Sequence, residues 1–407
     1  MSWEKVKLGK LYEVHNGLSK GRQFFGSGYP FLSFSTVFNN YFIPDELDEL
    51  VQSTEKEQEN YSIKRGDVFV TRTSETSDEL GMSCVALKDY PNATYNGFTK
   101  RMRPIDGGIA VFPEYIGYYM RMPSFRAEFQ AFSTMTTRAS LKNEDLLSLE
   151  IALPSYDTQK RIAEILRLYD NLIENNQKQI KLLEEVAQRV YKEWFVDFNC
   201  LNGNNFKDGK LPEGWKKDRA DAFFDITIGK TPPRSEKQWF VSREHGVKWI
   251  SISDMGKAGV FIFNTNEGLT EDAIDKHNIK VVPKGTILVS FKLTVGRISI
   301  ATENMCTNEA IAHFYIENDC LREYAYLYLK TFEYDTLGNT SSISKAVNSK
   351  IIKGMPFVMP NDETLQAFSN VVRPYFDLIY DKQLMIMKAQ EARDRLLPKL
   401  MNGEIEV

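Results

Sequence analysis

A long helix with a heptad repeat follows Pro154, and it constrains the fold more than any other feature of the sequence. Apolar residues recur from Ile162 to Trp194 at alternating steps of four and three residues, with Asn176 in the one gap. This spacing is typical of a helix that pairs with another helix along its length. A surface helix packed on a single domain would show a similar stripe, so the segment alone leaves two interpretations open.

A second copy of this helix lies 206 positions further along the chain. Residues 360–398 align with residues 154–192 without a gap, and ten of the 39 aligned pairs are identical. Average residue usage predicts about two or three identities. The two helices are therefore interpreted as a duplicated element whose copies pair with each other. The predicted seam consists of Ile162, Leu166, Tyr169, Ile173, Asn176, Ile180, Leu183, Ala187, Val190 and Trp194 in the first helix, and of Phe368, Val372, Tyr375, Ile379, Lys382, Ile386, Ala389, Arg393 and Leu396 in the second.

The segments that precede the two helices are repeated as well. Residues 64–71 match residues 283–290, and in both a turn leads into an apolar run that predicts a buried strand. Residues 31–35 and 249–253 alternate Ser with large apolar side chains and are also predicted to be strands. We expect Asp157-Thr158 to cap the first long helix.

The duplication predicts an α+β chain of two tandem globular α/β domains separated by two long helices. If these helices pair, they form an antiparallel coiled coil, with a globular domain at each end and a pseudo-two-fold axis between the halves. The predicted segments are domain one at 1–153, the first long helix at 154–198, a linker at 199–217, domain two at 218–359, and the second long helix with a C-terminal tail at 360–407.

Composition is that of an ordinary globular protein, with 42% apolar and 26% charged residues. No apolar run approaches the ~18 residues of a membrane span, and no signal-peptide core follows Met1, so we expect a cytoplasmic protein. The four Cys and four His residues lack metal-ligand spacing, so we expect neither bound metal nor disulfides. Net charge is −4, but residues 45–59 hold seven acidic residues and one Lys, and the remainder is +2. Net charge therefore does not exclude a DNA partner.

The arrangement resembles the DNA-specificity subunit of Type I restriction-modification systems over the whole chain. The marks are the tandem order of globular domain and long helix, Leu211-Pro212-Glu213-Gly214-Trp215 at the start of the second half, and the closing residues 396–405. Pro374 and Arg393 inside the second helix depart from a regular pattern, and Pro374 is expected to make that helix less regular.

The resemblance implies that the globular domains are target recognition domains, each reading one part of an interrupted site in double-stranded DNA. It also implies that the paired helices bind two modification (methyltransferase) subunits, with two restriction (nuclease/translocase) subunits as further partners. Adenine methylation and restriction would then reside in those partners. No cofactor is expected in this chain, and S-adenosylmethionine, ATP and Mg are expected in the partner subunits.

Motifs for catalysis are missing from the sequence, so we expect a chain that is not an enzyme. A base methyltransferase needs an Asn/Asp-Pro-Pro-aromatic loop, whereas Pro232-Pro233 follows Thr231 and precedes Arg234. The phosphate-loop pattern fails around Gly229-Lys230-Thr231, because Phe224 occupies the place of its first glycine.

DNA contacts are expected from basic and polar residues on loops and strand ends, which can reach phosphates and base edges. The candidates in the first half are Lys20, Arg22, Ser35, Arg72, Thr73, Lys100, Arg101 and Arg138. Those in the second half are Lys230, Arg234, Ser253, Lys292, Arg297, Asn308 and Lys345. For any single one of these residues, a solvated surface side chain is the competing interpretation.

Three alternative functions remain open from the sequence. The chain could serve a Type IIB or Type IIG-like enzyme whose partner fuses methylation and cleavage, and the identity of the partner would separate these cases. It could instead be a coiled-coil tether between two protein-binding domains, which DNA binding specific for two half-sites would exclude. An enzyme would methylate or cleave DNA as the purified chain.

Overall fold

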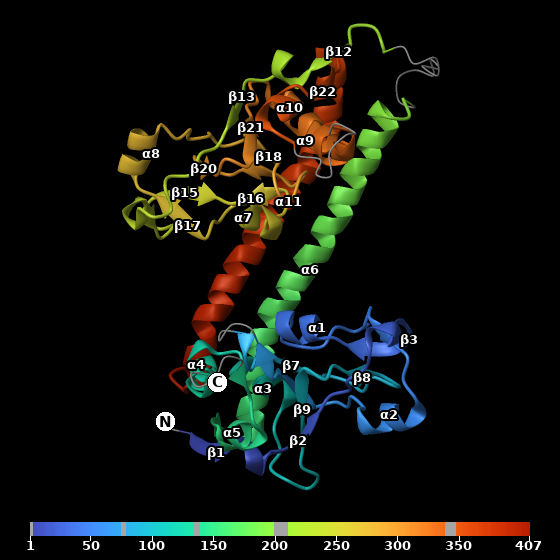
Figure 1. Cartoon of the computed structure of the whole chain (residues 1–407), viewed down its shortest axis with the longest axis vertical. Coiled ribbons are helices and arrows are strands. Elements are labelled where there is room, and N and C mark those ends of the chain that lie inside the picture. The colour runs from blue at the N-terminus through green and yellow to red at the C-terminus, as the bar shows by residue number, and fades with distance from the viewer. Residues whose placement is uncertain (1–2, 75–78, 134–138, 199–210, 338–346) are drawn as a thin grey trace. The chain divides into compact units, whose positions relative to one another are not determined.

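The computed structural model describes residues 3–74, 79–133, 139–198, 211–337 and 347–407 (Figure 1). The chain forms two compact units. Unit 1 comprises Met1–Leu172 and Ala389–Val407, and unit 2 comprises Ile173–Lys388. Each unit thus holds one set of strands together with part of each long helix.

A four-stranded antiparallel sheet forms the centre of unit 1. Its order is β2 (Tyr12–Asn16), β9 (Thr99–Pro104), β5 (Val68–Thr71) and β7 (Ser83–Val85). All four residues of β5 are buried, as expected for a run of β-branched and aromatic side chains. One face of the sheet packs against α3 (Pro113–Tyr119), α4 (Pro123–Ser133) and the start of α6 in a single apolar core.

Smaller elements complete unit 1. A three-stranded sheet has the order β4 (Leu50–Val51), β3 (Phe25–Leu32) and β8 (Thr94–Tyr95). Two further strand pairs and three short helices surround it and the central sheet. They are β1 (Glu4–Lys7) with β11 (Glu150–Leu153), β6 (Thr73–Ser74) with β10 (Ala139–Ser140), and α1 (Phe34–Asn39), α2 (Glu55–Asn60) and α5 (Asn143–Ser148).

Unit 2 repeats this plan with its own strands. Its central sheet has the order β13 (Ile226–Ile228), β21 (Ile311–Phe314), β18 (Ile287–Ser290), β19 (Ile298–Ala301) and β16 (Phe261–Ile262). A second sheet has the order β14 (Phe240–Val241), β17 (Glu267–Leu269), β15 (Val247–Ile250) and β20 (Cys306–Thr307). The remaining elements are β12 (Lys216–Arg219) paired with β22 (Pro356–Met359), and helices α7 (Ile252–Lys257), α8 (Glu271–His277), α9 (Arg322–Thr331) and α10 (Ser349–Lys353).

The turn that ends the central strand is built alike in both units. Thr71 Oγ1 accepts from Met82 N (2.9 Å) and donates to Glu79 O (2.6 Å), and Ser290 Oγ accepts from Arg297 N (3.0 Å) and donates to Thr294 O (2.5 Å). One glycine in each hairpin has a positive φ, 68° in unit 1 and 85° in unit 2. The repeat predicted for these segments is therefore present in the strand order and in the hydrogen bonds.

The long helices are α6 (Tyr156–Phe195) and α11 (Asp362–Met401), each 40 residues long. Ser155 Oγ accepts from Thr158 N (3.3 Å), and the equivalent Asn361 Oδ1 accepts from Thr364 N (2.9 Å). The predicted cap at Asp157-Thr158 is thus wrong by two residues, because Ser155 supplies the capping oxygen. α11 continues without a break through Pro374, which is exposed.

Within each unit the two helices contact each other in antiparallel order. In unit 1, Arg393 Nη1 donates to Asp170 Oδ1 (2.7 Å), and Arg161 Nη1 donates to Val407 O (3.2 Å) in the tail that follows α11. In unit 2, the rings of Trp194 and Phe368 lie 5.7 Å apart, and Asn176 Nδ2 lies 3.4 Å from Met385 Sδ. Rising numbers on α6 match falling numbers on α11 in both units.

Residues 31–35 and 249–253 are predicted to be strands, and the prediction is wrong for the last three residues of each segment. Strands β3 and β15 end at Leu32 and Ile250, and the next Ser begins a helix in each unit. Ser33 Oγ accepts from Thr36 N (3.2 Å), and Ser251 Oγ accepts from Asp254 N (3.2 Å). The alternation of Ser with apolar residues thus reflects helix capping and not a continued strand.

No helix in the described parts of the chain is both long enough and apolar enough to cross a lipid bilayer.

Candidate nucleic-acid interface

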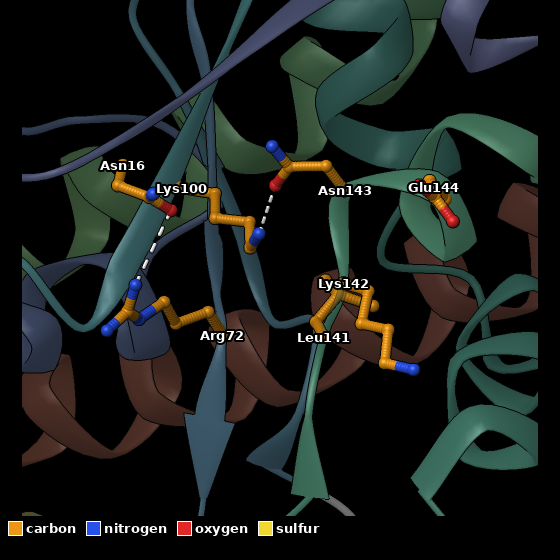
Figure 2. A pocket seen from close by; sticks show the side chains of 7 residues that line it. All are labelled: Asn16, Arg72, Lys100, Leu141, Lys142, Asn143 and Glu144. Atoms are coloured by element: carbon orange, nitrogen blue, oxygen red, sulfur yellow. Dashed lines mark hydrogen bonds between the residues drawn. The ribbon is translucent and has the colours of Figure 1, made fainter.

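A polar recess of about 440 Å³ opens at one end of the central sheet of unit 1 (Figure 2). Strands β2 and β9 place Asn16 and Lys100 directly opposite each other, and Arg72 follows β5. The segment that leads into α5 closes the other side of the recess. Its lining is Asn16, Arg72, Lys100, Leu141, Lys142, Asn143 and Glu144. The described lining therefore contains three cations and one carboxylate.

The two inner cations of this recess have few acceptors. Arg72 Nη1 lies 3.4 Å from Asn16 Oδ1, and its buried Nε has no hydrogen-bond partner among the described residues. Lys100 is only 5% exposed and donates to Asn143 Oδ1. Burial lowers the pKa of the Lys100 ammonium, Arg72 lowers it further, and Asp145 raises it. The positive charge of the recess is thus only partly compensated by the residues that the structure describes.

The same positions in unit 2 carry apolar side chains. Strand register matches them, since Asn16 pairs with Lys100 in unit 1 and Ile228 pairs with Ala312 in unit 2. Arg72 follows β5 as Phe291 follows β18, and Phe291 and Ala312 are fully buried. The sheet therefore does not need charged residues at these positions in order to fold.

Cations of unit 2 lie instead on its outer loops. Arg234 stacks on Phe240 and Trp249, with its guanidinium carbon 4.2 and 4.7 Å from the ring centroids, and it forms an ion pair with Glu267 (2.8 Å). Lys230 Nζ donates to His277 O (2.6 Å). These contacts hold both side chains in fixed orientations while leaving them exposed.

The tip of the β18–β19 hairpin of unit 2 carries an exposed apolar side chain. Leu293 is 95% exposed and has a φ of 61°, a backbone conformation that costs a leucine about 1 to 2 kcal/mol. The hydrogen bonds of Ser290 described above hold the loop in this shape, and the exposed Lys292 precedes the leucine. The hairpin tip thus places Leu293 in contact with solvent.

The remaining candidates of the first half divide by exposure. Arg22 and Ser35 are exposed, whereas Lys20 is held by Glu57 (2.8 Å). Arg101 is 4% exposed, donates to Ser62 O (2.7 Å) and lies over the Tyr95 ring, so it braces the core and does not line the recess. Thr73 lies in β6, and Arg138 falls outside the described residues.

The remaining candidates of the second half are mostly tied to their own loops. Arg297 Nη1 donates to Ile252 O (2.6 Å), and Asn308 Oδ1 accepts from Ala310 N (3.1 Å). Ser253 is exposed on α7, and Lys345 falls outside the described residues. Of the fifteen candidates, the recess brings together only Arg72 and Lys100.

The predicted seam residues are buried or partly buried throughout. Those that are fully buried include Ile162, Leu166, Ile173, Asn176, Val372 and Ile379. The partly buried ones include Tyr169, Ile180, Leu183, Tyr375, Lys382 and Ile386. Arg393, an irregularity in the heptad pattern, is explained in unit 1 by its bond to the buried Asp170, which also accepts from Tyr118 Oη.

Sequence reasoning missed Asn16, Lys142, Asn143 and Leu293. Asn16 becomes visible only through the pairing of β2 with β9, which joins residues 84 positions apart. A cluster of three or more His, Cys, Asp or Glu residues able to bind a metal is absent from the described part of the chain, and Cys84, Cys306 and Cys320 are free thiols.

Comparisons with known proteins agree on one family. A family model described as "Type I restriction modification DNA specificity domain" matches residues 1–185 and 212–382. The MjaIX type I restriction enzyme specificity subunit of Methanocaldococcus jannaschii is 27% identical, and the match covers 100% of this chain and 94% of that protein. The HindI specificity subunit of Haemophilus influenzae is 24% identical, with 99% of both chains covered. A crystal structure of the type I S subunit from M. genitalium shares the fold, with a TM-score of 0.57 at 15% identity over 98% of this chain and 96% of that one.

Proposed function

This chain belongs to the family of type I restriction-modification DNA specificity proteins, and from that premise we propose that it directs partner subunits to an interrupted DNA site whose two parts are read by its two halves. Sequence recognition of DNA is the function that the family assigns to the chain. The division of labour between the halves, the identity of the partners and their reactions are our proposal.

The observation that carries the proposal is the match of one DNA-specificity model to both halves of the chain. Each half has its own central sheet, in which four strands follow the same order, its own apolar core and its own set of polar loop residues. Two independent readers separated by helices suit a target whose two specified parts flank unspecified base pairs. We therefore assign residues 1–153 and 218–359 as target recognition domains, with residues 154–198 and 360–407 as long helices and 199–217 as the linker.

The partners are proposed to be two methyltransferase subunits, which methylate adenine, and two restriction subunits. S-adenosylmethionine, ATP and Mg would be bound by these subunits, and this chain would have no catalytic residue of its own. The antiparallel helix contacts within each unit support pairing of α6 and α11 as a coiled coil with pseudo-two-fold symmetry, which would set the gap between the two half-sites.

Co-expression with candidate methyltransferase subunits, followed by mapping of methylated adenines in genomic DNA, tests the proposal. We expect one interrupted sequence to be methylated only when both proteins are present. Methylation by the purified chain alone would contradict the assignment of catalysis to partners, and methylation of a continuous site would contradict the division between two readers.

A further inference from the structure

We propose that the polar recess of unit 1 binds a phosphate group of the DNA backbone, so that Arg72, Lys100 and Lys142 position the domain on the duplex instead of reading a base. This inference rests on the proposed function, because it takes DNA as the ligand.

Unused donors are the first support for an anion in the recess. Arg72 and Lys100 together carry eight N–H donors, and each has one acceptor among the residues that the structure describes. The bond from Arg72 to Asn16 is long at 3.4 Å, and Arg72 Nε is buried with no acceptor in the described part of the chain. A phosphate offers several acceptor oxygens and a compensating charge to such a site.

The balance of charge supports the same ligand. Among the described residues that line the recess, Glu144 is the one carboxylate against three cations, and the nearby Asp145 acts on Lys100 from α5. Because Lys100 is nearly buried beside Arg72, the two side chains repel each other until an anion enters. The volume of about 440 Å³ leaves room for the sugar that accompanies a backbone phosphate.

Unit 2 shows that the shared sheet does not depend on this charge. Ile228, Phe291 and Ala312 occupy the places of Asn16, Arg72 and Lys100 in a sheet with the same strand order. A fold that forms with apolar residues at these positions does not require cations there. The recess is therefore a feature that unit 1 has in addition to the shared fold.

A variant that carries the residues of unit 2, namely Asn16→Ile with Arg72→Phe and Lys100→Ala, tests the inference in the full chain, alone and with its methyltransferase partner. Duplexes with and without the target sequence are titrated at several salt concentrations. We expect affinity to fall about tenfold or more for both duplexes. The slope of log affinity against log salt should become shallower by about one to two.

A charge-matched control carries Lys10→Gln and Lys88→Gln, two exposed residues of unit 1 that do not line the recess. It should change affinity by less than about twofold. If the triple variant does not fold, Lys142→Gln, which alters an exposed residue of the recess, should still weaken both duplexes by about threefold.

Neutral methylphosphonate linkages, placed one at a time in the target duplex, identify the phosphate. At one position the unsubstituted chain should lose about tenfold in affinity while the triple variant loses little more, which is the signature of a direct contact. Loss confined to the target duplex would overturn the inference in favour of base recognition. Suppose instead that the affinity losses from the methylphosphonate and from the triple variant are additive at every position, and that millimolar inorganic phosphate displaces the DNA at matched ionic strength. These results would show a site for free phosphate and would overturn the inference as well. If the unsubstituted chain did not prefer its target duplex, the proposed function would fail, whereas an equal loss of affinity for both duplexes in the triple variant would still identify the phosphate contact.

Discussion

In unit 1, Asn16, Arg72 and Lys100 meet at one end of the central sheet, whereas the matching positions of unit 2 hold Ile228, Phe291 and Ala312. The order of the four strands β2, β9, β5 and β7 matches that of β13, β21, β18 and β19, and the hydrogen bonds of the following turn are the same in both units. The shared fold is thus maintained by the apolar strands and the turn, and the end of the sheet can be either polar or apolar.

The long helices show the same contrast. Asp170 of α6 and Arg393 of α11 form a nearly buried ion pair in unit 1, and in the repeat their places correspond to Phe376 and Ala187 in unit 2. Both residues of unit 2 are buried in its apolar core. Duplication has therefore kept the backbone while charge has become concentrated in unit 1 and apolar packing in unit 2.

Exchanging the equivalent residues Arg72 and Phe291 between the two units should give the largest effect on stability, and the effect should differ most between the units. Phe291→Arg places a cation in a fully buried apolar site of unit 2, and we expect a loss of about 4 kcal/mol in the free energy of unfolding. Arg72→Phe in unit 1 should cost less than about 1 kcal/mol, because the recess is open to solvent. Trp194, Trp215, Trp239 and Trp249 lie in unit 2, so denaturation followed by tryptophan fluorescence measures the cost of Phe291→Arg, and hydrogen exchange of β5 and β9 measures the cost of Arg72→Phe in unit 1. Equal costs in both directions would refute the contrast.

Breaking the ion pair of unit 1 should have the next largest effect. Arg393→Met leaves the buried Asp170 with Tyr118 as its remaining described hydrogen-bond partner, and we expect a loss of about 3 kcal/mol. The control Arg395→Met removes an exposed arginine that pairs with Glu391 on the same helix, and it should cost no more than about 0.5 kcal/mol. Hydrogen exchange of α3 and the start of α6 measures the effect within unit 1. Similar exchange rates in the two variants would show that the pair is not important for stability.

The sequence predicted the duplicated elements better than the site. Residues 64–71 and 283–290 repeat a turn and an apolar strand within a few positions, so local pattern is sufficient there. The helix predicted at 154–198 is observed as Tyr156–Phe195. It begins at Tyr156 because Ser155, which precedes Asp157, is the capping residue. The recess depends on the register between β2 and β9, which is set by distant pairing and leaves no local signal at Asn16.

Two smaller differences had readable signals. Ser33 and Ser251 are each followed three residues later by Thr36 and Asp254, whose backbone amides they cap, and this spacing is typical of a helix start. Arg393 could be identified as an exception to the heptad seam, but its partner Asp170 could not, because the charge lies on the other helix.

Low pH should destabilise unit 2 more than unit 1 because of a third pair of equivalent residues. Arg101 of unit 1 matches His313 of unit 2, whose ring bonds to Thr227 and Thr307, and burial lowers the pKa of His313 to about 3. The unfolded chain protonates this His near pH 6.5 and the folded unit does not, so its contribution to stability is lost as pH falls below about 6.5. Between pH 6.5 and 5 we expect unit 2 to lose about 2 kcal/mol from this residue. Arg101 stays charged over this range and adds no such loss to unit 1.

The variant His313→Gln isolates this effect from the titration of carboxylates. Its unfolding free energy, measured by tryptophan fluorescence, should fall less steeply between pH 6.5 and 5 than that of the unsubstituted chain. Parallel curves for the two proteins would show that His313 is protonated in the folded state as well.

The smallest effect on stability is expected at the tip of the β18–β19 hairpin of unit 2, where Leu293 is an exposed apolar side chain. Leu293→Asn should raise the free energy of unfolding by about 1 kcal/mol, since Asn tolerates a φ of 61° better than Leu does. Leu293→Ala, which keeps the unfavourable backbone, serves as the control and should leave stability unchanged within about 0.5 kcal/mol. If this exposed leucine beside Lys292 contacts DNA bases, both variants should bind the target duplex about fivefold more weakly. Their affinity for unrelated duplexes should not change, because an apolar side chain makes no phosphate contact. Greater stability of Leu293→Asn with undiminished target affinity would show that the hairpin tip lies away from the DNA, and that unit 2 reads its half-site through the stacked Arg234 and its neighbours instead.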